Sequence, residues 1–386
     1  MNAVIWAAGS LCAAASVAHF LSIGLVLGRR RDRPVPAPAT GHPPVTIIRP
    51  LCGVDFGVEA TLRSTFALDD PRAEIIFCVA SSSDPVVPLA QELIAEHPHV
   101  DAKLLAGNDR VSDNPKLNNV VKGWRAAAHP WIAMVDSNVM MPRDFVARLF
   151  AAQTPETGLV TSPPLGAEPD GFAAELECAF LNSYQARWQF AADAIGLGFA
   201  QGKLLFTHRD LIERAGGIGA LGGESAEDAA ATKIVRAAGL RVRLFDRPLP
   251  HPLGSRAFED VWQRQMRWAR LRRVTFPLYF LPEIFTGSVF PAACMAVLAA
   301  ALEWPAVLSV MLFLFAWYGA EALLVRAAGW PRTPHALLAW IVRDLLLPVL
   351  WIRAWAGRDF VWRGHAMTAD SSRDQLARNH AGAQGD

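Results

Sequence analysis

The 386-residue sequence has few lysines, almost no net charge and no close spacing of cysteines. Lysine supplies only five of the 37 basic residues, so local clusters of positive charge consist mainly of arginine. A net charge of +1 implies no general attraction to nucleic acid, and we expect no nucleic-acid partner. The five cysteines form no C-x-x-C pair, which argues against a zinc or disulfide framework. Function must therefore be sought in local motifs.

Apolar residues are abundant: they make up 52% of the chain, and the mean hydropathy is +0.21. The apolar run at 3–28 can cross ~30 Å of hydrocarbon at about 1.5 Å per residue. Four arginines between 29 and 33 follow this run, whereas a cleaved signal peptide carries its positive charge before it. We expect a membrane helix at 1–28, with a buried core helix as the alternative. The positive-inside rule then places the next domain in the cytoplasm, at the inner cell membrane.

Five prolines between 34 and 44 predict a stiff, extended linker over residues 29–44. From 45 to 258, short apolar runs alternate with helix-like segments, which is typical of an α/β domain with a mainly parallel sheet. The expected strands are 45–48, 75–80, 102–105, 131–135, 158–161, 204–207 and 242–245. The expected helices are 57–67, 86–97, 116–128, 172–192 and 226–238.

The C-terminal third is basic and aromatic at first and then apolar. Residues 259–282 contain a basic stretch with two tryptophans at 262 and 268, which predicts an amphipathic interfacial helix. Within 283–358 we expect membrane spans at 285–302 and 306–325. The run 336–355 contains Arg343, Asp344 and Pro348, so it is a poorer span and could be re-entrant or interfacial, with its charges forming a structural pair. Residues 359–386 form a polar tail, expected to be disordered from Ser371.

Acidic residues follow two of the expected strands. Asp136 comes directly after 131–135, and ligands of open α/β sheets bind at the carboxyl ends of strands. With Ser137 and Asn138 it offers the oxygen ligands that suit Mg²⁺ or Mn²⁺, although an Asx-turn would explain the same residues. Asp84 precedes Pro85 and suits an N-cap, a role that does not exclude ligand binding.

Two further groups can carry chemistry. Glu227 and Asp228 follow a glycine-rich stretch and begin an expected helix, where acidic residues favour the helix dipole or supply a general base. Arg264, Arg267 and Trp268 share one helix, and the two arginines lie on one face of it. They can grip a diphosphate or contact lipid headgroups at a membrane surface.

The joint order of these motifs resembles that of the ceramide glucosyltransferases. The resemblance runs from 45 to about 297. It is carried by the stretches Arg49-Pro50-Leu51-Cys52-Gly53-Val54-Asp55, Asn114-Pro115-Lys116-Leu117-Asn118-Asn119, Asp136-Ser137, Ala226-Glu227-Asp228 and Arg264-Gln265-Met266-Arg267-Trp268. It implies a Rossmann-like GT-A glycosyltransferase domain inserted between an N-terminal transmembrane helix and C-terminal membrane helices. One departure stands out: where the family has Cys-Val-x-Asp-x-Asp-Asp-Pro, this chain retains only the last acidic position, Asp84.

The resemblance also implies an activity: transfer of a hexose, glucose foremost, from a UDP-sugar to the primary hydroxyl of ceramide, with inversion, at the cytoplasmic leaflet. It implies a divalent metal, Mg²⁺ or Mn²⁺, on Asp136. Asp228 would be the base, and Glu227 would orient it or share its proton. Nucleotide contacts fall to Asp84 and Lys116. The diphosphate would be braced by the motif residues Arg264, Arg267 and Trp268.

Three alternatives remain open from the sequence. The same chemistry could act on diacylglycerol or a hopanoid. A polysaccharide synthase shares the Arg-x-x-Arg-Trp motif, although few spans follow the catalytic region here. A non-catalytic membrane scaffold with a degenerate sugar-nucleotide domain would explain Ser81-Ser82-Ser83 in place of the acidic positions.

Overall fold

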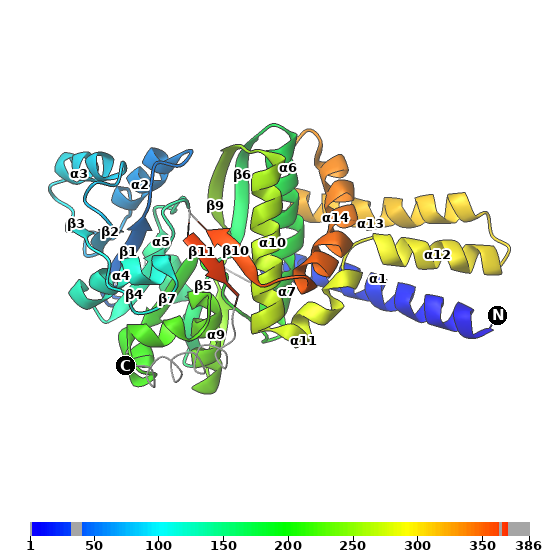
Figure 1. Cartoon of the computed structure of the whole chain (residues 1–386), viewed down its shortest axis with the longest axis horizontal. Coiled ribbons are helices and arrows are strands. Elements are labelled where there is room, and N and C mark those ends of the chain that lie inside the picture. Colours follow the sequence, from blue (N-terminus) through cyan, green and yellow to red (C-terminus); the bar gives the residue numbers. More distant parts are fainter. Residues whose placement is uncertain (1, 32–40, 363–364, 370–386) are drawn as a thin grey trace.

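The computed structural model describes residues 2–31, 41–362 and 365–369. The centre of the expected linker, 32–40, and the tail from 370 lie outside the described residues. An α/β layer forms one end of the molecule, and long helices extend from the other end (Figure 1). Between them stand the upright helices α6 (Phe172–Ala179) and α10 (Phe258–Thr275).

The α/β layer is built on a seven-stranded sheet in the order β3-β2-β1-β4-β7-β5-β8. Its strands are β1 Val45–Leu51, β2 Glu74–Val79, β3 Ala102–Ala106, β4 Trp131–Val135, β5 Thr157–Thr161, β7 Leu204–His208 and β8 Arg241–Leu244. β1 to β4 are parallel, as expected, but β7 runs antiparallel to both β4 and β5. Its register pairs Leu204 with Val135, so the residue before β7 lies beside the residue after β4.

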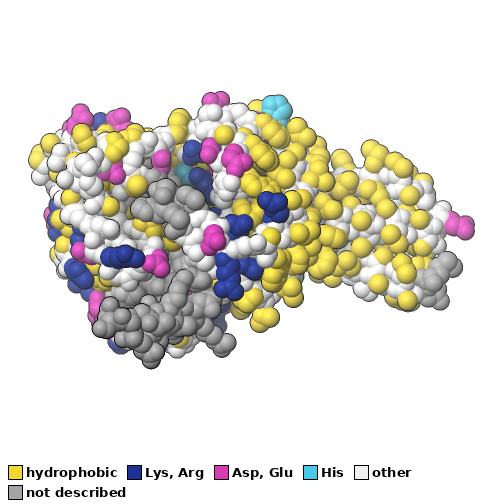
Figure 2. Space-filling view, in the orientation of Figure 1, with side chains coloured by type: hydrophobic (Ala, Val, Ile, Leu, Met, Phe, Trp, Pro, Cys, Tyr) yellow, Lys and Arg dark blue, Asp and Glu magenta, His cyan; other side chains and the backbone are white. Residues whose placement is uncertain are grey.

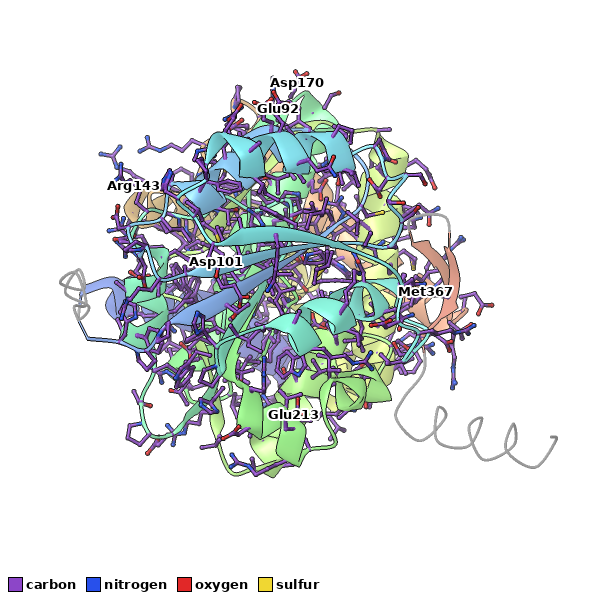
Figure 3. The ribbon with its side chains drawn as sticks, turned by 90° about the vertical axis from the view of Figure 1, so that its left-hand side faces the viewer. Glu92, Asp101, Arg143, Asp170, Glu213 and Met367 are labelled. Atoms are coloured by element: carbon purple, nitrogen blue, oxygen red, sulfur yellow. The ribbon has the colours of Figure 1, made fainter. Side chains whose placement is uncertain are left out.

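Helices cover both faces of this sheet, which explains why β1 and β2 are buried along their whole length. They are α2 Val58–Phe66, α3 Val87–Glu96, α4 Pro115–Ala126, α5 Phe145–Ala151, α8 Arg209–Arg214 and α9 Glu227–Ala237, with the 3₁₀ segment η2 at Ile218–Gly223. Seen from this end, Glu92 of α3 and Glu213 of α8 lie on opposite sides of the sheet (Figure 3). The α4 helix begins where Asn114 accepts hydrogen bonds from the backbone N–H groups of Lys116 and Leu117.

The middle layer differs from the single helix expected at 172–192. The helix α6 continues through a π-helical segment, η1 (Phe180–Ala186), into α7 (Arg187–Ala194), and all seven residues of η1 are buried. Beside it, β6 (Pro164–Asp170) and β9 (Leu249–Ser255) form a separate parallel pair. The antiparallel pair β10 (Asp359–Trp362) and β11 (His365–Thr368) lies near α10 in Figure 1, and Arg273 of α10 donates to the Gly357 carbonyl just before β10 (3.1 Å).

The helical end contains α1 Asn2–Arg31, α11 Pro277–Phe280, η3 Leu281–Phe285, α12 Val289–Ala301, α13 Ala306–Ala328 and α14 Ala336–Trp355. Among the described residues, Ala3–Arg29 and Ala306–Ala328 are each long and apolar enough to cross a membrane. The pair Pro277–Phe285 and Val289–Ala301, bent by 46°, adds a third span if it crosses as one unit. Hydrophobic side chains dominate this end of the surface, whereas charged ones gather towards the α/β layer (Figure 2).

The charges in α14 form a buried structural cluster, as the sequence indicated. Arg343 donates to both oxygens of Glu321 (2.9 and 3.1 Å) and to Asp344 (2.9 Å). Asp344 in turn accepts from the backbone N–H of Ser288 (2.9 Å) and from the Tyr318 hydroxyl (3.2 Å). These contacts join α12, α13 and α14, and they explain why this helix carries charge without exposing it.

Candidate active site

A buried arginine of the neighbouring strand β1 binds the backbone of the loop that follows β4. Arg49 of β1 is 0% exposed, and its guanidinium donates to the carbonyls of Asp136 (2.8 Å), Ser137 (2.9 Å) and Val139 (3.0 Å). The backbone N–H of Asp136 donates to the Lys203 carbonyl (3.2 Å). The position of Asp136 at the carboxyl edge of the parallel strands is therefore set by the backbone and not by its own carboxylate.

Two ammonium groups flank the Asp136 carboxylate. Lys116 contacts one oxygen at 2.6 Å, and Lys203 contacts the other at 3.1 Å. Lys203 also donates to the Asn138 side-chain oxygen (2.8 Å). Burial alone would raise the pKa of Asp136, but the two lysines outweigh it and hold that pKa below its usual value. Asp136 is thus a carboxylate between two cations.

Glu227 belongs to the same cluster. Lys116 contacts its carboxylate at 2.7 Å, and the Asn114 side-chain amide donates to its other oxygen at 2.7 Å. Lys116 also donates to the Gly202 carbonyl (2.8 Å). Burial would lower the pKa of Lys116, but Asp136 and Glu227 raise it above its usual value, so the lysine stays charged. Lys116 therefore joins the Asp136 loop to the first turn of α9.

Asp228 differs from its neighbour. Its carboxylate accepts from the backbone N–H of Ala229 (2.7 Å), and no ion pair to it occurs in the described part of the chain. Burial, together with the negative charge of Glu227, raises the pKa of Asp228 to about 7. A carboxylate of that basicity suits proton abstraction near neutral pH. The sequence did not distinguish Glu227 from Asp228 as a general base, but the structure does. Glu227 contacts the Lys116 ammonium and the Asn114 amide, whereas the pKa of Asp228 is raised.

The basic motif on α10 contacts the middle layer. Arg264 forms an ion pair with Glu177 of α6, a carboxylate that Arg256 also approaches at 3.6 Å. Trp268 packs against Cys178, Leu181 and Leu253. Arg264 is thereby fixed to a helix of the middle layer.

His251 of β9 is buried near the cations of this region. It is 2% exposed, and its pKa lies well below the usual value because of burial and then because of Lys203, Arg264 and Arg256. Burial and these three cations therefore keep His251 neutral.

Asp84 lies at the same edge of the sheet but apart from this cluster. Its carboxylate accepts from the backbone N–H groups of Gly53 (2.9 Å) and Val86 (3.0 Å). It therefore caps the turn before α3, and it also ties that turn to the loop after β1. In the structure Asp136, Lys116, Glu227 and Asp228 lie together. Asp84 contacts Gly53 and Val86 instead of these four residues.

Sequence reasoning missed Lys203, Glu177 and Gly202. Lys203 directly precedes an expected strand, and nothing in the sequence marks it, because its place beside Asp136 depends on the antiparallel direction of β7. Glu177 has a usable signal, since it and Glu175 are the two acidic residues of the mainly apolar stretch 172–181. Gly202 has a φ of +67°, and a Cβ there would lie 3.2 Å from the Asp228 carboxylate.

A divalent metal fits this site if the ligand supplies most of the coordination. The described residues contain no group of three or more His, Cys, Asp or Glu side chains that could hold an ion. Mg²⁺ sites that handle nucleotides often use one or two carboxylates and complete the shell with phosphate oxygens and water. The side-chain oxygens of Asp136 and Asn138 could supply the protein's share of that coordination. In this structure Lys116 and Lys203 contact these oxygens, and a bound diphosphate would attract the two lysines and leave the oxygens free for the metal.

Comparison with known proteins agrees with this fold. A family model described as glycosyl transferase family 21 matches residues 6–374. "Ceramide glucosyltransferase 3" of Caenorhabditis elegans is 26% identical over 333 residues, which cover 84% of this chain and 72% of that protein. A ceramide glucosyltransferase of Komagataella phaffii is 41% identical over 124 residues, covering 31% of this chain and 24% of that protein.

Among solved structures, the mannosyltransferase PcManGT from Pyrobaculum calidifontis, in complex with GDP-Man and Mn²⁺, superposes with a TM-score of 0.53. It is 20% identical, and the match covers 88% of this chain and 99% of that chain. The likeness confirms the glycosyltransferase GT-A fold that the motif order indicated.

Proposed function

This chain belongs to glycosyl transferase family 21, and on that premise we propose that it transfers glucose from UDP-glucose to the primary hydroxyl of ceramide, with inversion at the anomeric carbon. The names of its relatives, ceramide glucosyltransferases of a nematode and a yeast, support the acceptor and the sugar. The observation that carries the proposal is the cluster at the carboxyl edge of the sheet. There two lysines and a basic carboxylate meet around Asp136.

The positive groups of the cluster would bind the donor. A UDP-sugar brings a diphosphate, and Lys116 and Lys203 would move from the Asp136 carboxylate to its oxygens, with Arg264 nearby. Asp136 and Asn138 would hold Mg²⁺ or Mn²⁺. Such an ion stabilises the negative charge of a departing diphosphate. Arg267 and Trp268 of α10 would also contact the donor diphosphate. Asp84 would face the nucleotide end from the loop after β2.

Asp228 would take the proton from the acceptor hydroxyl. In an inverting transfer, the oxygen of the hydroxyl bonds to the anomeric carbon while the bond from that carbon to the diphosphate breaks. The hydroxyl proton passes to Asp228, whose raised pKa matches this task at neutral pH. Glu227 holds Lys116 and keeps the neighbouring carboxylate basic through its charge.

The membrane helices would bring the acceptor to this site. We propose that 45–258 is the cytoplasmic catalytic unit, that 259–282 lies at the membrane surface, and that 1–28 and 283–358 anchor it as a multi-pass protein of the inner cell membrane. The basic residues after the apolar run of α1 support this orientation. A two-chain lipid could then present its headgroup without leaving the bilayer.

The test is a donor and acceptor panel on the purified protein in detergent. UDP-glucose with ceramide should yield glucosylceramide, and UDP-galactose, UDP-GlcNAc and UDP-glucuronate should react more slowly. Diacylglycerol is the competing acceptor. Transfer to diacylglycerol but not to ceramide would overturn the acceptor assignment, and UDP binding without any transfer would favour a scaffold.

A further inference from the structure

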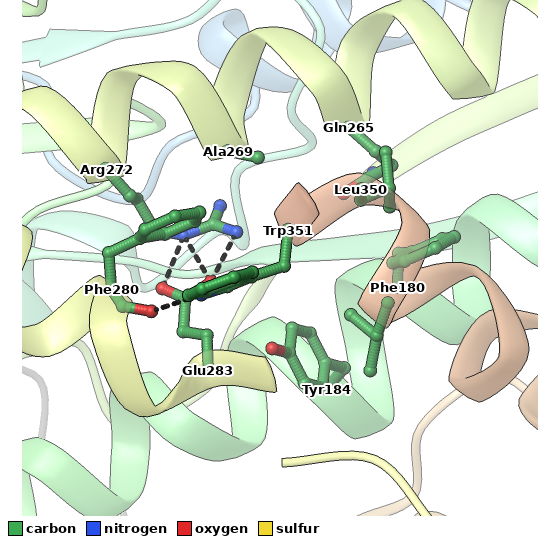
Figure 4. A pocket seen from close by; sticks show the side chains of 10 residues that line it. Phe180, Tyr184, Gln265, Ala269, Arg272, Phe280, Glu283, Leu350 and Trp351 are labelled. Carbon is green, nitrogen blue, oxygen red and sulfur yellow. Dashed lines mark hydrogen bonds and ion pairs between the residues drawn. The ribbon is translucent and has the colours of Figure 1, made fainter. Parts of the chain in front are cut away.

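Two arginines of α10 are neutralised by carboxylates. Arg264 forms an ion pair with Glu177, and Arg272 forms one with Glu283. The three contacts between Arg272 and Glu283 measure 2.8 to 3.1 Å and are drawn as dashed lines in Figure 4. An arginine paired in this way has little positive charge left for a further anion.

Two other arginines of the same helix have partners of a different kind. Arg270 and Arg273 are three residues apart, so they share one face of α10. Arg273 donates to the Gly357 carbonyl (3.1 Å), and Arg270 donates to the Asp359 carbonyl. Among the residues that the structure describes, neither of these arginines forms an ion pair with a carboxylate. Backbone carbonyls therefore orient both side chains without cancelling their charge.

A third arginine lies beside these two. Arg358 stands in the chain between Gly357 and Asp359, whose carbonyls accept from Arg273 and Arg270. Burial lowers the pKa of Arg273, and the positive charges of Arg358 and Arg270 lower it further. The three guanidinium groups, which we call the arginine cluster, are thus close enough to repel one another. An anion bound among them would relieve this repulsion, and the guanidinium fork matches the oxygens of a phosphate group.

Apolar and aromatic side chains adjoin the arginine cluster. The Arg273 guanidinium lies over the Trp355 ring, 5.3 Å from its centroid, and Trp355 is 45% exposed. Directly after α10, Leu278 of α11 is 85% exposed and Leu281 of η3 is 55% exposed. Exposed tryptophan and leucine next to arginine are typical of a surface that lies in the headgroup region of a bilayer.

We propose that the arginine cluster binds the phosphate of an anionic phospholipid from the adjoining leaflet. Its charge favours an anionic lipid over a zwitterionic one, whose ammonium group the arginines would repel. The apolar neighbours favour a lipid over a soluble phosphate, because they offer contacts to acyl chains. This inference goes beyond the proposed transfer reaction, since the lipid at this site is bound and is not glycosylated.

The arginine cluster has no direct link to the proposed donor site. Within the described residues, no hydrogen bond or ion pair joins Arg270 or Arg273 to Asp136, Lys116 or Lys203. We therefore expect the phospholipid and UDP to bind without competition. Because Arg264 lies on the same helix as the cluster, a phospholipid bound there would also fix the orientation of α10 at the membrane surface.

The experiment measures the affinity of the full chain, in a neutral detergent, for dioctanoyl phosphatidylglycerol. Arg270→Gln/Arg273→Gln should raise the Kd roughly 10- to 30-fold, since each arginine near an anionic lipid contributes about fivefold. Arg326→Gln, which changes an exposed arginine at the end of α13, is the control and should leave the Kd within twofold. Dioctanoyl phosphatidylcholine and inorganic phosphate should bind the parent much more weakly, and saturating UDP should not displace the phosphatidylglycerol.

Several results would overturn the site. Equal Kd values in the parent and the double variant would do so, as would equal binding of phosphatidylcholine. Inorganic phosphate that binds as tightly as the lipid would indicate a soluble anion, and displacement by UDP would assign the arginines to the donor site.

A measurement on the unaltered protein covers the case in which the double variant does not fold. In nanodiscs, a phosphatidylglycerol with a diazirine near its headgroup should label peptides within 270–281 or 355–362. Labelling only elsewhere would contradict the proposal. Neither experiment uses ceramide or a sugar donor as substrate, so its outcome is independent of the proposed function.

Discussion

Asp228 and Glu227 are adjacent in sequence but contact different groups. Glu227 is held by Lys116 and Asn114, while burial and its neighbour's charge raise the pKa of Asp228 to about 7. The difference in basicity between these two carboxylates depends on the groups that surround each of them in the folded protein. The local sequence does not predict it.

Asp228 predicts the acid limb of the pH profile. If Asp228 is the base, kcat/KM for the acceptor should rise about tenfold per pH unit below pH 7 and level off above it. An unshifted aspartate, with a pKa near 3.8, would give a plateau from about pH 5. Steady-state rates between pH 5 and 9 check this. Asp228→Asn should lose at least about a hundredfold in kcat and keep its UDP affinity.

The same pKa shift makes a stability prediction. A carboxyl whose folded pKa is raised adds nothing below its unfolded pKa and destabilises the fold increasingly as pH rises from about 4 to 7. Asp228→Asn removes that penalty, so its melting temperature should exceed that of the parent at pH 8 and approach it at pH 4. Equal melting temperatures at both pH values would contradict the shift.

Lys116 is the residue on which donor affinity should depend most. Lys116→Met removes a charge-assisted contact of about 1.5–3 kcal/mol, so the Kd for UDP should rise roughly 10- to 100-fold in calorimetry. Lys103→Met is the control, because Lys103 pairs with Glu74 at the opposite edge of the sheet (2.7 Å). An unaltered Kd in Lys116→Met would exclude this lysine from the donor site.

At the scale of elements, two features assemble the site. The antiparallel direction of β7 places Gly202 and Lys203 beside Asp136 and Asp228. The α10 helix presents Arg264 on one face, towards Glu177, and Gln265 on the next, towards α14. One helix thereby contacts α6 through Arg264 and η1 through Gln265.

Gly202 should be intolerant of a side chain for two separate reasons. Its φ of +67° costs an L-residue about 1–2 kcal/mol, and an added Cβ would lie 3.2 Å from the Asp228 carboxylate. Gly202→Ala should therefore lower both the melting temperature and kcat. Gly239→Ala is the matched control, since its φ is +72° and no atom lies within 4 Å of its Cβ. It should cost similar stability and leave kcat unchanged; equal kcat losses would contradict a local effect on Asp228.

At the scale of the whole molecule, polar contacts join the membrane helices to the α/β layer. Arg29, near the end of α1, donates to the Leu244 carbonyl of β8 at 2.6 Å and pairs with Asp193 of α7. Arg343 of α14 donates to Ser183 of η1 at 2.8 Å. The contact of α1 with β8 and that of α14 with η1 therefore hold the helical end in a defined arrangement against the rest of the molecule.

The contribution of Arg343 to the stability of this arrangement can be tested by substitution. Arg343→Met would leave Asp344 buried without its cation and Glu321 with only the more distant Arg187 (3.7 Å), at a cost of about 3–5 kcal/mol. The melting temperature in detergent should fall sharply, whereas the exposed Arg326→Met should change it little. Recovery in the double variant Arg343→Met/Asp344→Asn would assign the loss to the uncompensated charge; no loss in the single variant would contradict the account.

Much of the fold was predictable because strand, helix and membrane patterns are local. The expected strand 131–135 coincides with β4, and the span expected at 306–325 lies within α13. The direction of β7 and the π-helical segment were not predictable, because both depend on packing between distant segments. Of the site, the motif order located Asp136, Lys116, Glu227 and Asp228, whereas Lys203 became visible only through its contact with Asp136 across 67 positions.

By itself, the sequence determined the class of fold, the apolar helices and the family. These follow from the alternation of strand and helix patterns, from the apolar runs and from the order of the motifs, all of which can be seen without knowing which residues are in contact. The tertiary structure alone decided which carboxylate is basic, which cations neutralise Asp136 and that Gln185 meets Gln265 across 80 positions. The physical reason is the same in each case: ionisation and hydrogen bonding depend on distance and burial in space, and the chain brings these groups together only when it folds.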